Sequence, residues 1–263
     1  MKILAIETST AICAAAFISN STVIAEQSRN EPQVHSEQLL TLVDAVLSSY
    51  DSSNKPVDAV AVSIGPGSFT GLRIGLSVAK GLCFAWDTPI IAVPTLTALA
   101  WNCKQYSIGN SGDYILSMID ARRNEAYAAL FRIQDGDTLE SPPERGKGVL
   151  SLQQRNIVEV YPAQAVTLET CVTWAQQHHC TIILGDATEK FLHCIEQQSE
   201  PGPALLVPQK EHSVPCAASV GLLGEQLLAK GVTANVSSLE PYYIKEFVTV
   251  AQPQIMVNQH GMV

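Results

Sequence analysis

The first hundred residues alternate between short apolar runs and stretches with helical apolar spacing. Turn-prone residues separate three apolar or β-branched runs, which predict consecutive antiparallel strands at 2–8, 13–19 and 22–28. Ser36 can cap a helix whose apolar positions recur at helical spacing, namely Leu39, Leu40, Val43, Val46, Leu47 and Tyr50. A buried strand, a second helix and another strand follow at 57–64, 68–86 and 89–93, so the predicted order is βββαβαβ.

The second half of the chain repeats this pattern weakly. An apolar strand ending in an acid is predicted at 114–120, like the first strand of the chain, and another strand follows at 125–133. Helices are predicted at 167–178, 187–198 and 213–230, with a strand at 181–184 between the first two and Gly231 ending the last. The stretch 134–148 is predicted to be an exposed loop, and the residues beyond Val250 a frayed tail.

Two copies of one unit imply two lobes related by duplication. We therefore expect an α/β protein with an N-lobe at 1–105 and a C-lobe at 106–210. The helix at 211–231 is expected to pack back on the N-lobe, and 232–263 to form a C-terminal tail.

The helix at 68–86 has very little polar surface. Its strongly polar side chains between Leu72 and Phe84 are Arg73, Ser77 and Lys80, whose spacing places them on one narrow stripe. A second stripe of small residues, Gly71, Gly75 and Ala79, would allow close approach of a neighbouring backbone. Such a wide apolar surface predicts burial on two sides, by the sheet of the lobe and by another chain. The alternative is a central helix buried wholly within its own domain.

A glycine turn and two acidic strand ends are candidate ligand sites. Gly65, Gly67 and Ser68 join a buried strand to this helix, and such a turn can present backbone N–H groups to a phosphate. The glycines can equally serve close packing, because neither a GxGxxG nor a Walker motif is present. Acids and hydroxyls end the first strand of each predicted unit, so the candidate nucleotide contacts further include Glu7, Thr8, Ser9 and Asp120.

Composition narrows the class of protein. With 46% hydrophobic residues the chain can bury a full core, and it contains neither an export leader nor a run of about 18 apolar residues. Its seven cysteines include no CxxC pair, which is typical of buried thiols in a reducing compartment. We therefore expect a cytoplasmic protein that does not enter a membrane. The net charge of -9 opposes direct binding to nucleic-acid phosphates.

Other catalytic motifs are incomplete. Ser77 stands in a near match to the GxSxG nucleophile motif, but it lies inside a predicted helix and the second glycine is missing. The residues His178, His179, Cys180, His193 and Cys194 lie near one another in the sequence without a recognised ligand spacing. The sequence therefore supports neither a serine hydrolase nor a metal site of its own.

Three motifs resemble a known family. The segments 3–9 (ILAIETS), 64–75 (IGPGSFTGLRIG) and 119–127 (IDARRNEAY) resemble the TsaB (YeaZ) family of tRNA threonylcarbamoyladenosine biosynthesis proteins. The resemblance covers the N-lobe and the start of the second lobe, and it is loose between about 136 and 208. It implies an ASKHA (actin/Hsp70/sugar-kinase) fold, related to the catalytic paralogue TsaD.

The resemblance also implies a role without catalysis. TsaD carries an HxxxH metal-binding pair on its first helix, whereas here His35 is followed by Leu39. One imidazole does not hold a divalent ion unaided, so the resemblance implies a scaffold subunit that is not itself an enzyme. It would dock on TsaD, work with the ATPase TsaE, contact tRNA only through the complex and form a homodimer when alone. Its implied partner interface comprises His35, Leu39, Leu42, Val46, Leu72, Arg73, Leu76 and Lys80.

Two alternative functions stay open from the sequence. One is an ASKHA ATPase or kinase that acts alone, and the other is an M22-type peptidase. The resemblance implies no cofactor of the chain's own, although ATP or ADP could lie at the interface with TsaD.

Overall fold

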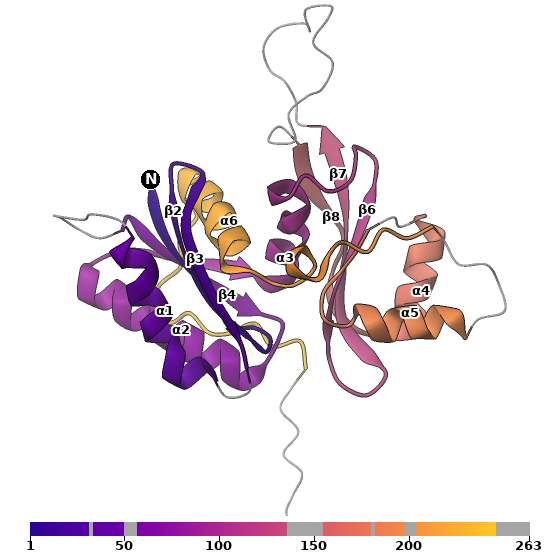
Figure 1. Cartoon of the computed structure of the whole chain (residues 1–263), viewed down its shortest axis with the longest axis horizontal. Helices are drawn as coiled ribbons and strands as arrows, with labels where there is room; N and C mark the ends of the chain where they lie inside the picture. Colours follow the sequence, from indigo (N-terminus) through magenta and orange to yellow (C-terminus); the bar gives the residue numbers. More distant parts are fainter. Residues whose placement is uncertain (32–33, 50–56, 136–154, 180–181, 198–203, 246–263) are drawn as a thin grey trace, which may run out of the picture.

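The computed structural model describes residues 1–31, 34–49, 57–135, 155–179, 182–197 and 204–245 (Figure 1). Tyr50, Cys180, most of the loop predicted at 134–148 and the tail predicted beyond Val250 lie outside these residues. None of the helices in the described ranges combines the length and the apolarity that a membrane crossing requires.

The N-lobe is built on a five-stranded sheet in the order β3-β2-β1-β4-β5. Its strands nearly coincide with the predicted ones, at β1 (Lys2–Glu7), β2 (Ile12–Ser19), β3 (Thr22–Asn30), β4 (Ala59–Gly65) and β5 (Ile90–Pro94). The pairs β1–β2 and β2–β3 are antiparallel, whereas β1–β4 and β4–β5 are parallel. A parallel pair needs a crossover, and helices provide both crossovers of this sheet.

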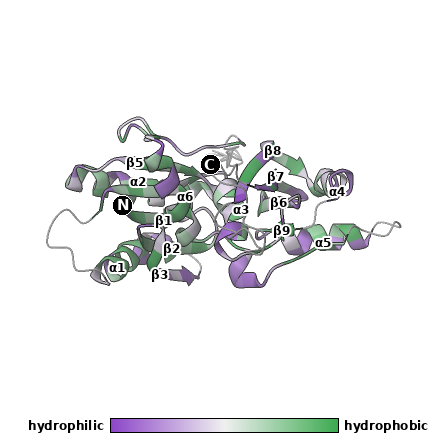
Figure 2. Ribbon diagram, turned by 90° about the horizontal axis from the view of Figure 1, so that it is seen from above, coloured by the Kyte–Doolittle hydropathy of each residue, from purple (hydrophilic) through white to green (hydrophobic). Residues whose placement is uncertain are grey.

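Helices cover both faces of the N-lobe sheet. Leu4 and Ile6 of β1 point to α1 (Val34–Ser48) and α2 (Phe69–Trp86), whereas Ile3 and Ala5 point to α6 (Ala217–Ala229). This alternation follows from the two-residue period of a strand. The buried strands β1 and β2 are mostly hydrophobic, whereas the edge strand β3 is partly hydrophilic (Figure 2). The helix α6 returns to the N-lobe from the end of the chain and packs against β1, β2 and β4.

Of the two N-lobe helices α1 and α2, only α1 starts at a different residue from the predicted cap. Ser36 was expected to cap α1, but this helix begins at Val34, so that Ser36 lies in its first turn. Ser68 does cap α2, because its hydroxyl oxygen accepts the N–H of Gly71 at 3.2 Å.

The C-lobe sheet repeats the N-lobe arrangement with four strands, in the order β8-β7-β6-β9. These are β6 (Tyr114–Asp120), β7 (Glu125–Asp135), β8 (Arg155–Thr167) and β9 (Ile182–Leu184). Two antiparallel pairs and the parallel pair β6–β9 reproduce the pairing of β3, β2, β1 and β4. The duplicated, two-lobed ASKHA-type α/β fold expected from the sequence is therefore confirmed.

Three elements were absent from the prediction. Helix α3 (Thr95–Gln105) follows β5 directly and packs against strands of both sheets, on the face of the C-lobe sheet opposite α4 (Leu168–Gln177) and α5 (Thr188–Glu196). Strand β8 forms one edge of the C-lobe sheet. A short 3-10 helix, η2 (Lys210–His212), precedes α6.

The C-terminal segment 232–245, expected to be a tail, lies along the N-lobe. Its residues Ala234, Val236 and Leu239 pack against the core that α1 and α2 form with the sheet. The second side of α2 is therefore covered in part by the protein's own chain.

Candidate functional site

The turn after β1 packs tightly on the start of α2. A Cβ atom at Gly67 would lie 2.3 Å from the carbonyl oxygen of Ser9, and one at Gly71 would lie 2.1 Å from that of Thr8. Further along the helix, a Cβ atom at Gly75 would meet the hydroxyl of Thr8. The glycines of this segment therefore serve close packing between the strand end and the helix, one of the two roles that the sequence left open.

Glu7 lies beneath this turn and not in a cleft. Its carboxylate is fully buried and accepts the backbone N–H of Ser9 at 2.5 Å. Burial raises the pKa of Glu7, and hydrogen bonds to the carboxylate offset only part of that effect. Thr8 is also fully buried. Neither side chain lines the cavity between the lobes, so these two predicted nucleotide contacts are corrected to residues of the core.

A cavity of about 880 Å³ separates the two lobes. Of the predicted nucleotide contacts, Ser9, Gly67 and Ser68 line its N-lobe wall and Asp120 lines its C-lobe wall. Its other polar wall residues are Thr10, Glu31, His35, Ser36, Thr70, Arg122, Tyr127 and Asp186. The remaining candidate, Gly65, lies at a different pocket.

Two carboxylates meet at the C-lobe wall of this cavity, at the ends of β6 and β9. Asp186 accepts the backbone N–H of Asp120 at 2.8 Å, and Asp120 pairs with the Lys190 ammonium at 2.7 Å. Burial raises the pKa of Asp186, and the nearby Asp120 carboxylate adds to this effect. Sequence reasoning found Asp120 from the repeated strand end, but Asp186 and Lys190 carried no comparable signal.

Two backbone N–H groups at the N-lobe wall of this cavity are already hydrogen-bonded. The N–H of Ser68 donates to Ser9 at 2.6 Å and that of Gly71 to the Ser68 hydroxyl, so these two donors of the turn are already engaged. Among the charged residues that line the cavity, three carboxylates, Glu31, Asp120 and Asp186, face one arginine, Arg122. Asp120 is paired with the Lys190 ammonium, which offsets part of this negative charge. The nucleotide contacts expected at Ser9, Gly67, Ser68 and Asp120 stay predictions.

His35 and Leu39 stand where the resemblance to TsaD implies a pair of metal-binding histidines. The His35 imidazole lies 3.1 Å from the carbonyl oxygen of Ile12, while Leu39 is 1% exposed. Across the described part of the chain, no three His, Cys, Asp or Glu side chains are grouped closely enough to hold a metal ion. Of the histidines and cysteines weighed as ligands, His178 instead lies 2.8 Å from the hydroxyl of Tyr161.

Most residues expected at the partner interface lie in the core. The buried ones, which face their own sheet from α1 and α2, are Leu39, Leu42, Val46, Leu72 and Leu76. Their prediction as contact residues is corrected, because their side chains already pack inside the N-lobe. Arg73 is exposed, and His35 and Lys80 are half-buried.

Two apolar side chains outside the predicted partner interface point outward from these helices. Leu40 of α1 is 60% exposed and Phe84 of α2 is 89% exposed. A signal for Phe84 was present in the sequence, since it continues the polar stripe of Arg73, Ser77 and Lys80 at helical spacing.

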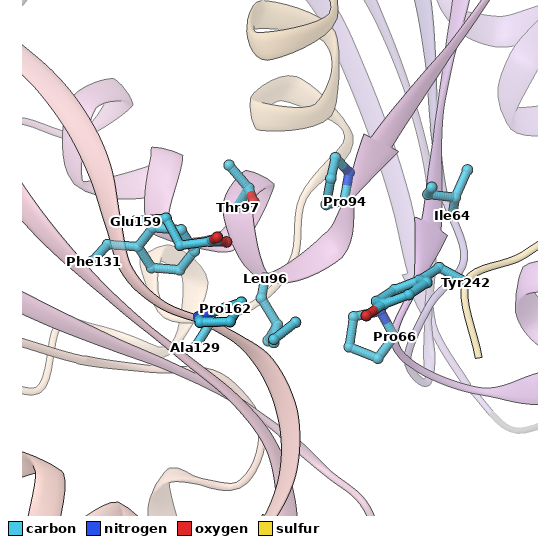
Figure 3. Close-up of a pocket in the computed structure, with 12 residues that line it drawn as sticks. Ile64, Pro66, Pro94, Leu96, Thr97, Ala129, Phe131, Glu159, Pro162 and Tyr242 are labelled. Atoms are coloured by element: carbon cyan, nitrogen blue, oxygen red, sulfur yellow. The ribbon is translucent and has the colours of Figure 1, made fainter. Parts of the chain in front are cut away.

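A second, mostly apolar pocket of about 340 Å³ lies between the lobes (Figure 3). Ile64, Pro66 and Tyr242 face it from the N-lobe side, while Phe131 and Pro162 face it from the C-lobe sheet. Gly65 lines this pocket, with φ of +119°, and a Cβ atom there would lie 2.5 Å from the carbonyl oxygen of Tyr242. Its role is therefore to admit the C-terminal segment.

Comparisons with known proteins agree with the motifs. The family described as "TsaD: tRNA N6-adenosine threonylcarbamoyltransferase" matches residues 22–149. The tRNA threonylcarbamoyladenosine biosynthesis protein TsaB of Escherichia coli K12 is 29% identical over 250 residues, which cover 94% of this chain and 96% of that protein. The chain is therefore similar to a TsaB protein along nearly its whole length.

Further proteins are similar to parts or all of the chain. The TsaB protein of Bacillus subtilis 168 is 36% identical over 137 residues, or 52% of this chain and 57% of that protein. The fold is shared with YeaZ from Pseudomonas aeruginosa, with a TM-score of 0.69 at 23% identity, covering 92% of this chain and 99% of that one. The names of both TsaB relatives place those proteins in tRNA threonylcarbamoyladenosine biosynthesis.

Proposed function

We propose that this chain is a member of the TsaB family and acts as a non-catalytic scaffold that docks on TsaD. In the cytoplasm it would work with TsaD and the ATPase TsaE, and it would support transfer of threonylcarbamoyl from an adenylate to the adenosine next to the anticodon. The observation that carries the proposal is the burial of Leu39 in the N-lobe core. The resemblance to TsaD implies a metal-binding histidine at this position. The chain would carry no cofactor of its own, and ATP or ADP would lie at the interface with TsaD.

The proposed docking surface is the outer face of α1 and α2. These helices lie side by side on one face of the N-lobe sheet (Figure 1). Leu40 and Phe84 are large apolar side chains left in solvent there, and burying such groups drives association. The proposed contact residues are therefore Leu40, Phe84 and the exposed Arg73. The buried residues of the predicted interface are left out.

The same face would also support self-association. Two copies related by a two-fold axis can bury one patch against itself, which is the simplest closed assembly. We propose that the free chain is a homodimer through this surface, and that TsaD competes with the second copy for it.

Sedimentation of the purified chain, alone and mixed with TsaD, tests the docking surface. Phe84→Glu should weaken both associations, because it would place a charge where an apolar contact is proposed. The matched control is Val158→Glu on β8 of the C-lobe, a valine that is 39% exposed, which should leave both associations unchanged. If Phe84→Glu is folded and binds like the unmodified protein in both assays, the interface lies elsewhere.

Contact with tRNA would be made through the complex. Counterion release on phosphate contact supplies most non-specific affinity, and a net charge of -9 opposes such contacts. Filter binding at about 0.15 M salt should show no binding to tRNA in the micromolar range, where non-specific binders begin to be retained. Micromolar or tighter binding by the isolated chain would contradict this part of the proposal.

A further inference from the structure

The segment that follows α6 crosses from one lobe to the other. The N–H of Ala234 donates to the carbonyl of Ile90 at 2.9 Å, and that of Tyr242 donates to the carbonyl of Ile64 at 2.7 Å. Between these points, the Lys80 ammonium donates to the carbonyl of Ser237 at 3.1 Å. Backbone hydrogen bonds to β5 and β4 therefore fix the path of this segment over the N-lobe.

An aromatic contact anchors the segment to α2. The ring of Tyr243 stacks on Phe69 with centroids 4.8 Å apart, and its hydroxyl accepts a hydrogen bond from Arg73 Nε at 3.0 Å. The Arg73 guanidinium also lies 3.8 Å from the centre of the Phe69 ring. The three side chains form one stack, in which a cation and two aromatic rings hold each other in place.

The next anchor lies on the C-lobe. The Lys245 ammonium pairs with Glu125 Oε2 at 2.7 Å and donates to the carbonyl of Ala121 at 3.2 Å. It also lies 5.6 Å from the centre of the Tyr127 ring. Tyr243 and Lys245 are two residues apart, and two extended residues span at most about 7 Å. Because Tyr243 is bound to α2 and Lys245 to the C-lobe, the short chain between them limits how far α2 and the turn after β6 can separate.

Both anchors touch walls of the large cavity between the lobes. Phe69 lines that cavity from the N-lobe, whereas Ala121 and Tyr127 line it from the C-lobe. Helix α3 packs against strands of both sheets and provides a separate connection between the lobes. The segment before α6 is a further connection, because the N–H of Gly185 donates to the carbonyl of Ser213 at 2.7 Å. A two-lobed protein can open by a hinge motion unless contacts outside the hinge prevent it.

We propose that residues 234–245 form a latch that holds the two lobes at a fixed separation and so sets the opening of the cavity between them. The C-lobe end of the latch is the part that can release. The side chains of Lys245 and Glu125 are 32% and 37% exposed, so water and salt weaken their attraction. The N-lobe end has more backbone contacts and the aromatic stack, and it would stay in place. This proposal does not depend on docking to TsaD.

Hydrogen exchange of the full chain, read by mass spectrometry, tests the latch. Lys245→Met keeps most of the aliphatic side chain but removes the charge, and Lys230→Met at the exposed end of α6 is the matched control. The latch predicts faster exchange in Lys245→Met on both cavity walls, in the turn 121–127 and in the first turn of α2 at 69–73. The expected acceleration is about two- to fivefold, the range that an exposed ion pair corresponds to.

A contact of only local importance would give a different pattern. Faster exchange confined to 121–127, or no change in either segment, would overturn the latch. A second variant, Tyr243→Phe, keeps the stacked ring and removes the hydroxyl bound to Arg73. It should accelerate exchange at 69–73 and leave 121–127 slower than in Lys245→Met, and equal exchange of the two variants at 121–127 would also count against the latch.

Discussion

His35 and Leu39 lie one turn apart on α1 and have unrelated surroundings. The His35 ring contacts the carbonyl oxygen of Ile12 at the helix start, while the Leu39 side chain is enclosed by the N-lobe core. The resemblance to TsaD implies a metal-binding histidine at position 39, and in this chain that position holds an apolar side chain packed in the core.

Restoring the second histidine should damage the fold and not create a metal site. Leu39→His would bury a polar ring among apolar neighbours, at a cost of about 2–4 kcal/mol in the free energy of unfolding. Val232→His, at a position that is 50% exposed and outside the proposed interface, should change it by less than about 0.5 kcal/mol. Urea unfolding of both variants measures the difference, and a Leu39→His protein as stable as Val232→His would contradict the burial of this side chain.

Two glycines of α2 should respond in opposite directions to an added methyl group. A Cβ atom at Gly71 would lie 2.1 Å from a backbone carbonyl oxygen, so Gly71→Ala should destabilise the protein by about 1–3 kcal/mol. At Gly81 nothing lies within 4 Å of such an atom, and Gly81→Ala should stabilise it by about 0.5–1 kcal/mol through helix propensity. Thermal unfolding should order the melting temperatures as Gly81→Ala, unmodified protein, Gly71→Ala. Any gain in stability from Gly71→Ala would mean that the turn after β1 does not press on the helix.

The close packing at these glycines and the N-lobe strands could be predicted from the sequence. Spacing alone placed Gly71 and Gly75 on one stripe of α2 and predicted a close neighbouring backbone, and the turn after β1 is that neighbour. The N-lobe strands were predicted nearly to the residue because strong apolar runs end at turn-forming residues.

Other elements could not be predicted because their signals are not local. Helix α3 is buried over most of its surface and therefore lacks the one-sided apolar stripe of a surface helix. Strand β8 contains charged residues and Pro162, which an edge strand tolerates and an interior strand does not. The segment after α6 has no periodicity, and its partner Arg73 is 170 residues away from Tyr243 in the sequence.

The orientation of α2 about its own axis was the main source of error at the candidate site. The width of the apolar surface predicted two covered sides, but not which leucines face the sheet. Leu72 and Leu76 face it, and the exposed stripe ends at Phe84. The second cover is partly the C-terminal segment, which the sequence pattern had placed in a tail.

Glu7 should make stability depend on pH in a defined direction. Burial raises the pKa of this carboxyl above its ordinary value of 4.5, so the folded state binds its proton more tightly than the unfolded state. The folded state is therefore penalised when pH rises through the raised pKa, and no penalty exists below 4.5. Glu7→Gln should be more stable than the unmodified protein at pH 7, with a gain that shrinks toward pH 4.5. Urea unfolding across this range measures the gain, and one that stays constant or grows on acidification would contradict the burial of a strained carboxylate.

The proposed division of labour between this chain and TsaD is tested most directly by a time course of threonylcarbamoyladenosine formation. The purified chain would be incubated with tRNA and the threonylcarbamoyl adenylate, first alone and then together with TsaD and TsaE. We expect no product from the chain alone, because Leu39 stands where a metal ligand is needed, and product when TsaD and TsaE are added. Product formed by this chain alone, at a rate comparable with that of the complete mixture, would contradict the scaffold role.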